Sequence, residues 1–211
     1  MLDDIKGLIF DCDGTLVDSA PLYARAWGAG FAVSGAVMAD DWYHDRKGLS
    51  EHVLMESFEE ASGLTLDRSA TIATMREAFL AKLTVLREIR AIGDIARAAK
   101  GIMPLAVASG GPRAIVEPSL EHTGLAELFA AIVTLDDVGA PKPQPDLFLE
   151  AARRLKLEPT ACLVVEDSPI GFEAAEAAGM RWLDVRDGDQ VKALLRDLTQ
   201  AQQAKQAAKR E

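Results

Sequence analysis

Two aspartates, Asp11 and Asp13, stand two positions apart directly after an apolar run at residues 8–10. A short, wholly apolar run is typical of a strand buried on both faces of a parallel sheet. Ligands of such sheets bind at the carboxyl ends of the strands. Residues two apart on a strand leave on the same side, so both carboxylates can face one site, where like charges need a cation, a shared proton or water. A solvated turn, in which Asp and Gly are common, is the alternative.

Polar residues also follow the later apolar runs. Because the carboxyl ends of parallel strands meet at one edge of a sheet, these side chains can converge with Asp11 and Asp13. They are Ser109 and Gly110 after residues 104–108, Lys142 in a proline-rich loop after residues 131–135, and Glu166 and Asp167 after residues 161–165. Taken singly, Ser109 is typical of a helix cap or a turn, and we expect Ser168 and Asp146 to be helix N-caps.

Together these residue types supply what phosphoryl transfer needs. A carboxylate can attack phosphorus and form an aspartyl-phosphate, and a second acid can protonate the leaving oxygen and later activate water. Mg²⁺, held by carboxylates and waters, offsets the charge of the acids and the phosphate. A lysine and backbone N–H groups at the start of a helix stabilise the transferring oxygens. Prolines at positions 141, 143 and 145 are expected to hold the backbone around Lys142 rigid and extended.

The elements that position these residues alternate regularly after residue 91. Such alternation predicts an α/β fold, a doubly wound parallel sheet with helices on both faces. The expected helices are residues 92–100, 113–122, 147–155 and 170–178, and the expected strands are residues 104–108, 131–135, 161–165 and 181–185. Pro112 and Pro169 suit first helical turns, and Gly124 and Gly179 suit positions just past helix ends. From Thr199 onward we expect a frayed surface helix without a function.

Residues 18–88 interrupt this alternation. Apolar residues recur there at helical spacing, Gly48 and Gly63 punctuate the pattern, and no convincing strand occurs. We therefore expect three or four inserted helices. The prediction is a core domain of residues 1–17 and 89–211 and a small α-helical domain of residues 18–88.

Composition excludes several classes of protein. The chain has 211 residues and a formal net charge of −10, which argues against nucleic acid and anionic membranes as partners, because both are bound by basic surfaces. No run approaches the ~18 apolar residues of a membrane span, and the acidic amino terminus predicts no signal peptide. Cys12 and Cys162 are the only cysteines, so a reducing compartment fits better than a disulfide framework. We expect a cytoplasmic protein.

The constellation resembles the haloacid dehalogenase superfamily along nearly the whole chain. The matching motifs come in the family's order: DCDGT at residues 11–15, Ser109, Lys142 within APKPQPDLF, and VVEDS at residues 164–168. The inserted helices resemble the C1-type cap of the subgroup that contains β-phosphoglucomutase and small sugar-phosphate phosphatases. The resemblance implies a Rossmann-like core and a cap that closes over it as a lid.

The resemblance also implies roles for the site residues and a small phosphorylated metabolite as the partner, with Mg²⁺ as the cofactor. We expect a monomer or a weak homodimer. The resemblance assigns Asp11 as the nucleophile and Asp13 as the general acid and base. It places Asp11, the Asp13 backbone carbonyl and Asp167 around Mg²⁺, with Glu166 supporting the metal or joined to it through water, and Ser109, Gly110 and Lys142 around the phosphoryl group.

The expected activity is Mg²⁺-dependent hydrolysis of small phosphate monoesters, sugar or polyol phosphates. Dehalogenases resemble the pattern without its second aspartate, which is present here as Asp13. A β-phosphoglucomutase-type mutase is the main alternative, because RKGLSEHVL at residues 46–54 resembles the mutase cap loop. Two departures disfavour it: Tyr23 stands in place of a hinge histidine, and Glu51 stands in place of an arginine that binds the second phosphate. A non-catalytic sensor of a phosphorylated metabolite is the alternative from another class.

Four residues of the helical insertion are candidates for substrate specificity: Arg46, Lys47, Ser50 and Glu51. The alternative for Arg46 and Glu51 is a solvated helix face. We expect Trp27 to pack inside the insertion rather than to stack on a substrate.

Overall fold

Five parallel strands form one sheet in the spatial order β3-β2-β1-β4-β5. The computed structural model describes residues 2, 4–39 and 41–208. The strands are β1 (Gly7–Phe10), β2 (Leu105–Ala108), β3 (Ala131–Val133), β4 (Cys162–Glu166) and β5 (Arg181–Asp184). The strand order reverses between β1 and β4, and open α/β sheets bind their ligands outside the carboxyl ends at such a point.

The three central strands are buried along their whole length. Every residue of β1, β2 and β4 is buried, as apolar runs predict for a sheet covered on both faces. In the register of the two middle strands, Phe10 lies opposite Val165, and the Asp11 N–H donates to the Val165 carbonyl at 2.9 Å. Asp11, which follows β1, and Glu166, which ends β4, are therefore neighbours.

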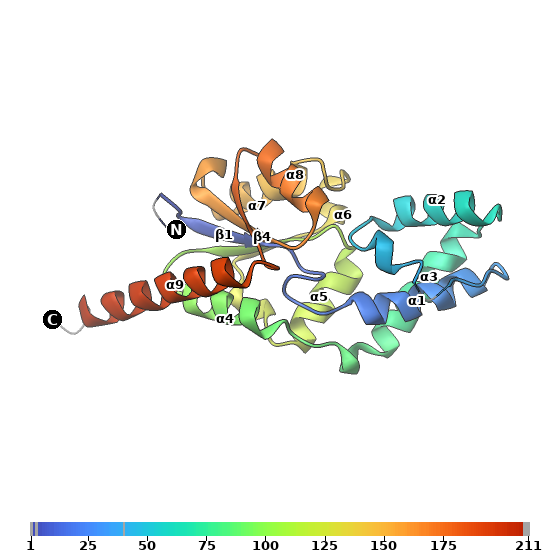
Figure 1. The fold of residues 1–211 in the computed structure, drawn as a ribbon, viewed down its shortest axis with the longest axis horizontal. Coiled ribbons are helices and arrows are strands. Elements are labelled where there is room, and N and C mark those ends of the chain that lie inside the picture. Colours follow the sequence, from blue (N-terminus) through green and yellow to red (C-terminus); the bar gives the residue numbers. More distant parts are fainter. Residues whose placement is uncertain (1, 3, 40, 209–211) are drawn as a thin grey trace.

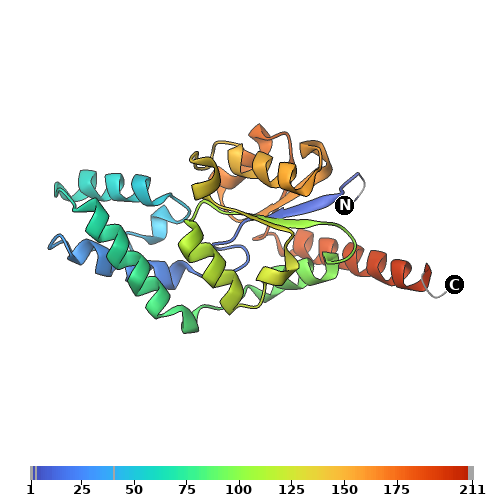
Figure 2. The ribbon, with the colours of Figure 1, turned by 180° about the vertical axis from the view of Figure 1, so that it is seen from behind.

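Helices cover both faces of the sheet, which confirms the doubly wound α/β prediction (Figures 1 and 2). On one face, α7 (Asp146–Leu155) and α8 (Pro169–Ala177) pack on Ile9 and Val164. On the other face lie α4 (Arg90–Ala99), α5 (Arg113–His122) and α9 (Gly188–Ala208), which share a core with Leu8, Phe10 and Val165.

The segment between β1 and α4 is helical, as predicted. It contains α1 (Ala20–Ala32), α2 (Glu51–Ser62) and α3 (Arg68–Ala81), with the 3₁₀ turns η1 (His44–Arg46) and η2 (Leu83–Val85). These helices group at one end of the molecule (Figures 1 and 2). Trp27, Phe31 and Phe58 stack between them, as expected of Trp27, and the aromatic rings hold α1 against α2.

The helical segment leaves and rejoins the sheet layers at one place. Val17 and Glu88 form an isolated antiparallel bridge, and the Asp18 N–H donates to the Arg87 carbonyl at 2.9 Å. The predicted domain boundaries, at residues 17–18 and 88–89, fall on this bridge. The division into two domains stays a prediction.

Two local boundaries differ from the prediction. The surface helix expected from Thr199 is present, but α9 begins earlier, at Gly188, because Val191, Leu194 and Leu198 form an apolar stripe that is buried beneath it. The predicted strand 131–135 ends at Val133, and a short helix, α6 (Leu135–Val138), follows. A capping box starts that helix, in which the Asp137 side chain accepts from the Thr134 N–H at 2.8 Å.

Two of the expected caps differ in outcome. Ser168 is the N-cap of α8, with its side chain accepting from the Gly171 N–H, as predicted. Asp146 was wrongly predicted as an N-cap. It is the first residue of α7 and makes no capping bond, because the N-cap position belongs to Pro145.

Two further predictions concern the cysteines, for which no disulfide framework was expected, and the helices, of which none was expected to span a membrane. Cys12 and Cys162 are buried and unpaired. α9, with 21 residues, is long but largely polar, and none of the helices across residues 2, 4–39 and 41–208 has the length and apolarity needed to cross a bilayer.

Arg154 ties the edge of the sheet to α6 and α7. It donates to Asp137 at 2.7 Å, to Glu150 at 2.7 Å and to the Ile132 carbonyl at 3.0 Å. Burial raises the pKa of Asp137, but hydrogen bonds from Arg154 and Thr134 outweigh it and lower that pKa to about 2. Hydrogen bonds from Arg153 and Arg154 lower the pKa of Glu150 to about 2. This network fixes both ends of the loop that carries Lys142.

We expect Arg154→Ala to lower the free energy of unfolding by about 1 kcal/mol at pH 7. Because the folded-state pKa values of both acids are depressed, the contribution is complete above the unfolded pKa near ~4 and is lost as the pH falls toward ~2. Urea unfolding at pH 7 and pH 3 should show a smaller difference from wild type at pH 3. Arg153→Ala is the control and should change stability less, because among the described residues Arg153 pairs with Glu150 alone. An equal effect of Arg154→Ala at both pH values contradicts the network.

Candidate active site

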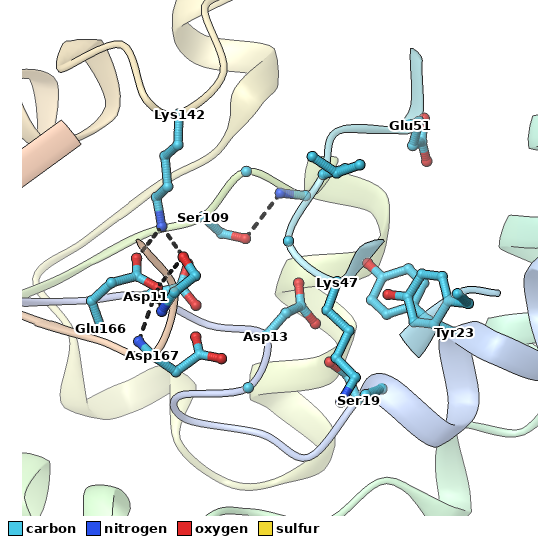
Figure 3. Close-up of a pocket in the computed structure, with 18 of the residues that line it drawn as sticks. Asp11, Asp13, Ser19, Tyr23, Lys47, Glu51, Ser109, Lys142, Glu166 and Asp167 are labelled. Atoms are coloured by element: carbon cyan, nitrogen blue, oxygen red, sulfur yellow. Dashed lines mark hydrogen bonds and ion pairs between the residues drawn. The ribbon is translucent and has the colours of Figure 1, made fainter. Parts of the chain in front are cut away.

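The polar strand ends surround one cavity at the carboxyl edge of the sheet (Figure 3). Every site residue that was predicted in the α/β core lines it: Asp11, Asp13, Ser109, Gly110, Lys142, Glu166 and Asp167. The helical segment closes the other side, and it contributes Ser19, Ala20, Tyr23, Trp27, Tyr43, Lys47, Gly48, Leu49 and Glu51. The cavity therefore lies between the sheet and the inserted helices.

Lys142 bridges two carboxylates at the centre of the cluster (Figure 3). Its Nζ lies 2.6 Å from Asp11 Oδ1 and 2.6 Å from Glu166 Oε2. The side chains are 6%, 8% and 1% exposed, respectively, so little solvent screens these pairs. The lysine comes from the loop before α7, and the peptide between Lys142 and Pro143 is cis.

Glu166 is held by a full set of hydrogen bonds. Its Oε1 accepts from the backbone N–H groups of Asp167 and Ser168, each at 3.0 Å, and from the Ser168 hydroxyl at 2.9 Å. Its Oε2 accepts from Lys142. Glu166 is thereby fixed, and it in turn fixes the lysine.

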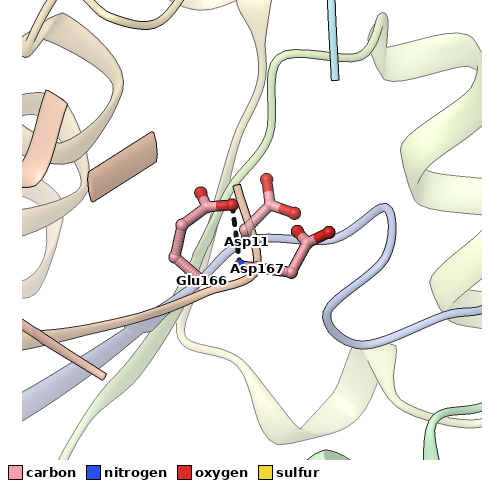
Figure 4. A group of neighbouring side chains, drawn as sticks. All are labelled: Asp11, Glu166 and Asp167. Atoms are coloured by element: carbon pink, nitrogen blue, oxygen red, sulfur yellow. Dashed lines mark hydrogen bonds between the residues drawn. The ribbon is translucent and has the colours of Figure 1, made fainter. Parts of the chain in front are cut away.

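Asp11, Glu166 and Asp167 form a group of three carboxylates (Figure 4). One oxygen from each lies within 4.8 Å of the others. Thr15 donates to Asp167 Oδ1 at 3.2 Å. The single ammonium of Lys142 balances only one of these three potential charges, so the group has the charge and the oxygen ligands that suit a divalent cation.

Burial dominates the electrostatics of this group. Burial, followed by the Glu166 charge, raises the pKa of Asp11 well above its usual value and the pKa of Asp167 to about 6. For Glu166 burial also disfavours the charge, but Lys142 outweighs it and lowers the pKa. Burial lowers the pKa of Lys142, but Asp11 and Glu166 outweigh it and raise that pKa. The lysine is charged, and further positive charge is needed to ionise all three acids.

Asp13 faces the cavity but lies outside the group of three carboxylates. The chain turns sharply after it, because Gly14 has a φ of +87° and its N–H donates to the Val17 carbonyl at 2.9 Å. A Cβ at position 14 would meet Asp167 Oδ2 at 2.5 Å, so only glycine fits. Burial raises the pKa of Asp13, while Ser19 and Lys142 lower it. A carboxyl group with a raised pKa suits proton transfer near neutral pH.

Ser109 starts a tight turn rather than a helix. Its Oγ accepts from the Gly111 N–H at 3.0 Å, and the N-cap position of α5 belongs to Pro112. Ser109 and Gly110 line the cavity next to the acids, so the alternative reading of Ser109 as a plain helix cap does not hold.

The comparisons with known proteins agree with this geometry. The family model described as haloacid dehalogenase-like hydrolase matches residues 5–179. The chain belongs to this family. The predicted membership and the prediction of a family enzyme of the phosphatase class are confirmed.

Three relatives of this hydrolase illustrate the match. It is 35% identical to the fructose-1-phosphate phosphatase YqaB of Escherichia coli K12, over 88% of this chain and 99% of YqaB. It is 31% identical to a phosphoglycolate phosphatase of Escherichia coli O157:H7, over 84% of this chain and 79% of that protein. The crystal structure of CbbY from Rhodobacter sphaeroides in complex with phosphate superposes with a TM-score of 0.77 at 27% identity, covering 84% of each chain.

The predicted specificity residues of the helical segment divide into two pairs. Lys47 and Glu51 line the cavity. Ser50 is a buried residue at the N-cap of α2 and is not among the lining residues. Arg46 is not among the lining residues either: its guanidinium donates to Ser57 Oγ at 3.0 Å and to the Trp42 carbonyl at 3.0 Å, both within the helical segment.

Several lining residues were missed from the sequence. Tyr23 was noted only as a departure from the mutase pattern, whereas Ser19 and Tyr43 were not singled out. Thr15, which donates to Asp167 without lining the cavity, was missed as well, although its place within the first motif was a usable signal. Tyr43 carried none, because it reaches the cavity only through the folding of the segment between α1 and α2.

A close approach of backbone to Glu166 gives a test of this site. A Cβ at Gly171, in the first turn of α8, would meet the Glu166 carboxylate at 2.1 Å. Gly171→Ala should therefore lower the free energy of unfolding by about 1–3 kcal/mol through overpacking. Gly28→Ala, at a helical glycine with nothing within 4 Å, is the matched control and should raise it by about 0.5–1 kcal/mol. Denaturant unfolding measures both, and equal stability of the two variants would refute the packing around Glu166.

Proposed function

We propose that this hydrolase releases phosphate from small phosphate monoesters, with Mg²⁺ as cofactor and an aspartyl-phosphate formed on Asp11. The observation that carries the proposal is the contact of Lys142 with both Asp11 and Glu166. The Lys142 ammonium donates to Asp11 Oδ1, whereas Asp11 Oδ2 accepts no hydrogen bond from the described residues. One carboxylate oxygen is thus oriented, and the other is available as a nucleophile.

The three carboxylates support a metal site. Buried acids that outnumber the nearby cations need a positive ion, and carboxylate oxygens are the ligands that Mg²⁺ prefers. Asp11 and Asp167 are the proposed ligands, joined by the backbone carbonyl of Asp13. Because the hydrogen bonds of Glu166 already use both of its oxygens, we assign it a supporting role. When bound, Mg²⁺ offsets the charge of the acids and of the phosphoryl group.

The chain's own residues then have separate roles. Asp11 attacks phosphorus, and the bond from phosphorus to the ester oxygen breaks. Asp13 donates a proton to that oxygen and later takes one from the water that hydrolyses the aspartyl-phosphate. Lys142, Ser109 and the backbone at Gly110 hold the phosphoryl oxygens in this scheme.

We further propose that residues 18–88 act as a cap domain over a core domain of residues 1–17 and 89–211. Both parts line the cavity, so closure of the helical segment would exclude water from the reacting groups. The leaving group would then meet Lys47 and Glu51. The predictions of a cytoplasmic location and of a monomer or weak homodimer stay predictions.

Sugar and polyol phosphates are the substrates we propose. The relative named as a fructose-1-phosphate phosphatase supports this class, since the two chains match over nearly their whole length. The mutase alternative requires a second phosphate in the cavity, where the Glu51 carboxylate would repel it.

We expect Asp11→Asn to lower phosphate release by about a thousandfold or more, because an amide oxygen is a poor nucleophile. Release of inorganic phosphate from a panel of sugar, polyol and nucleotide phosphates is the measurement. Asp94→Asn, on the exposed face of α4, is the control and should match wild type. Turnover by Asp11→Asn within tenfold of wild type would rule out the covalent mechanism.

Metal dependence has a test that needs no turnover. Mg²⁺ should raise the melting temperature of the metal-free protein, because a ligand of the folded state stabilises it. Asp167→Asn should reduce this shift strongly, whereas Asp13→Asn should slow turnover and leave the shift nearly intact, since only its backbone is assigned to the metal. An unchanged shift in Asp167→Asn would remove Asp167 from the metal site.

Two further measurements separate the alternatives. Formation of glucose 6-phosphate from β-glucose 1-phosphate, with a trace of the bisphosphate, would replace the phosphatase by a mutase. Binding of phosphate esters without any Mg²⁺-dependent release of phosphate would indicate the sensor.

A further inference from the structure

The helical segment presents polar groups to the cavity. Tyr23 from α1 and Glu51 from the first turn of α2 line it (Figure 3). Tyr43, from the segment before η1, lines it as well. In the proposed scheme the phosphoryl group is held by the residues at the strand ends, so the leaving group would meet the lining residues of the helical segment. Their chemistry therefore bears on which leaving groups fit.

Arg76 on α3 fixes the Glu51 carboxylate. Its Nε donates to Oε1 at 2.9 Å and its Nη2 donates to Oε2 at 2.6 Å, a bidentate pair in which each oxygen keeps a second lone pair. The Glu51 side chain is 13% exposed and the Arg76 side chain is 35% exposed. Glu51 therefore stands at the cavity in one orientation, ready to accept further hydrogen bonds.

The two tyrosines add neutral hydroxyl groups. Both side chains are almost fully buried, and no described residue forms a hydrogen bond with either hydroxyl. Burial raises the pKa values of Tyr23 and Tyr43, and the charge of Asp13 raises both further. Both hydroxyl groups therefore remain protonated. A phenol hydroxyl can donate to and accept from an alcohol.

We propose that Arg76 is a positioning residue that holds Glu51 as a hydrogen-bond acceptor for hydroxyl groups of the leaving group, with Tyr23 and Tyr43 as its partners. This inference rests on the proposed phosphatase function and narrows it. A fixed carboxylate accepts hydrogen bonds from a polyol, but it repels a carboxylate or a second phosphate on the substrate. The preferred substrates are then phosphate esters of polyhydroxylated, otherwise uncharged molecules.

A different result is expected if the Arg76–Glu51 pair has a purely structural role. Arg68 and Glu59 join the same two helices, with Arg68 Nη2 at 2.5 Å from Glu59 Oε2, and neither lines the cavity. If the Arg76–Glu51 pair only held α2 against α3, its loss would affect all substrates alike, as would the loss of the Arg68–Glu59 pair. Arg68→Met is thus a matched control.

The test compares kcat/KM for three esters: fructose 1-phosphate, 2-phosphoglycolate and p-nitrophenyl phosphate, which has neither hydroxyl nor carboxylate groups. In Glu51→Gln and Arg76→Met, the ratio for fructose 1-phosphate over p-nitrophenyl phosphate should fall about tenfold, mainly through KM, as expected for a weakened charged hydrogen bond. In Glu51→Gln the ratio for 2-phosphoglycolate over p-nitrophenyl phosphate should rise, because the repelling charge is gone. Arg68→Met should leave both ratios unchanged.

Variants of similar shape keep the test decisive. Glu51→Gln retains the size of the side chain, and Arg76→Lys retains the charge without the bidentate geometry, so it should fall between wild type and Arg76→Met. Tyr23→Phe and Tyr43→Phe remove one hydroxyl each and should lower the fructose 1-phosphate ratio several-fold. Unchanged ratios in Glu51→Gln and Arg76→Met overturn this inference while the phosphatase stands. If wild type hydrolyses none of the three esters with Mg²⁺, the proposed function itself fails.

Discussion

The ammonium of Lys142 between Asp11 and Glu166 is the interaction on which the site depends. Three acids converge because the strands that carry them are parallel and adjacent, and without a cation their mutual repulsion would favour protonation. Lys142, from the loop before α7, supplies part of the required positive charge. Backbone hydrogen bonds hold Glu166 in place, and Glu166 in turn holds the lysine near Asp11. A metal ion would balance the remaining negative charge of the acids together with that of a bound phosphoryl group.

The sheet makes this convergence unavoidable. β1 and β4 lie side by side at the point where the strand order reverses, and their register places the acids after each strand at the same level. The helices above and below exclude water from the strands but leave the carboxyl edge open. The helical segment then covers that edge, so the cavity is enclosed between the sheet and the inserted helices.

The core half of the site was predictable from the sequence because strand-end positions follow from topology. Apolar runs located the strands, alternation made them parallel, and Asp11, Ser109, Lys142 and Glu166 then had to share an edge. The roles proposed for them came from resemblance and from chemistry, and they await the experiments above. Gly14 was part of the recognised motif, although its contact with Asp167 emerged only from the structure.

The helical half was less predictable, because its contacts join positions with no common pattern. Arg76 and Glu51 are 25 residues apart and meet only when α3 packs beside α2. Arg46, adjacent in sequence to a lining residue, instead turns toward Trp42 and Ser57. The start of α9 was missed for another reason: its apolar stripe is sparse within a polar sequence, so packing against α4, rather than composition, defines it.

The bridge between Val17 and Glu88 has a consequence for how this architecture can vary. The inserted segment begins and ends at neighbouring backbone positions. Whatever its length, it therefore connects to the sheet in the same way as a single surface loop. The entropy cost of a longer loop grows only slowly with its length. Chains of this kind can therefore acquire, exchange or rebuild the part that meets the leaving group while the strand register, and the acids set by it, stay where they are.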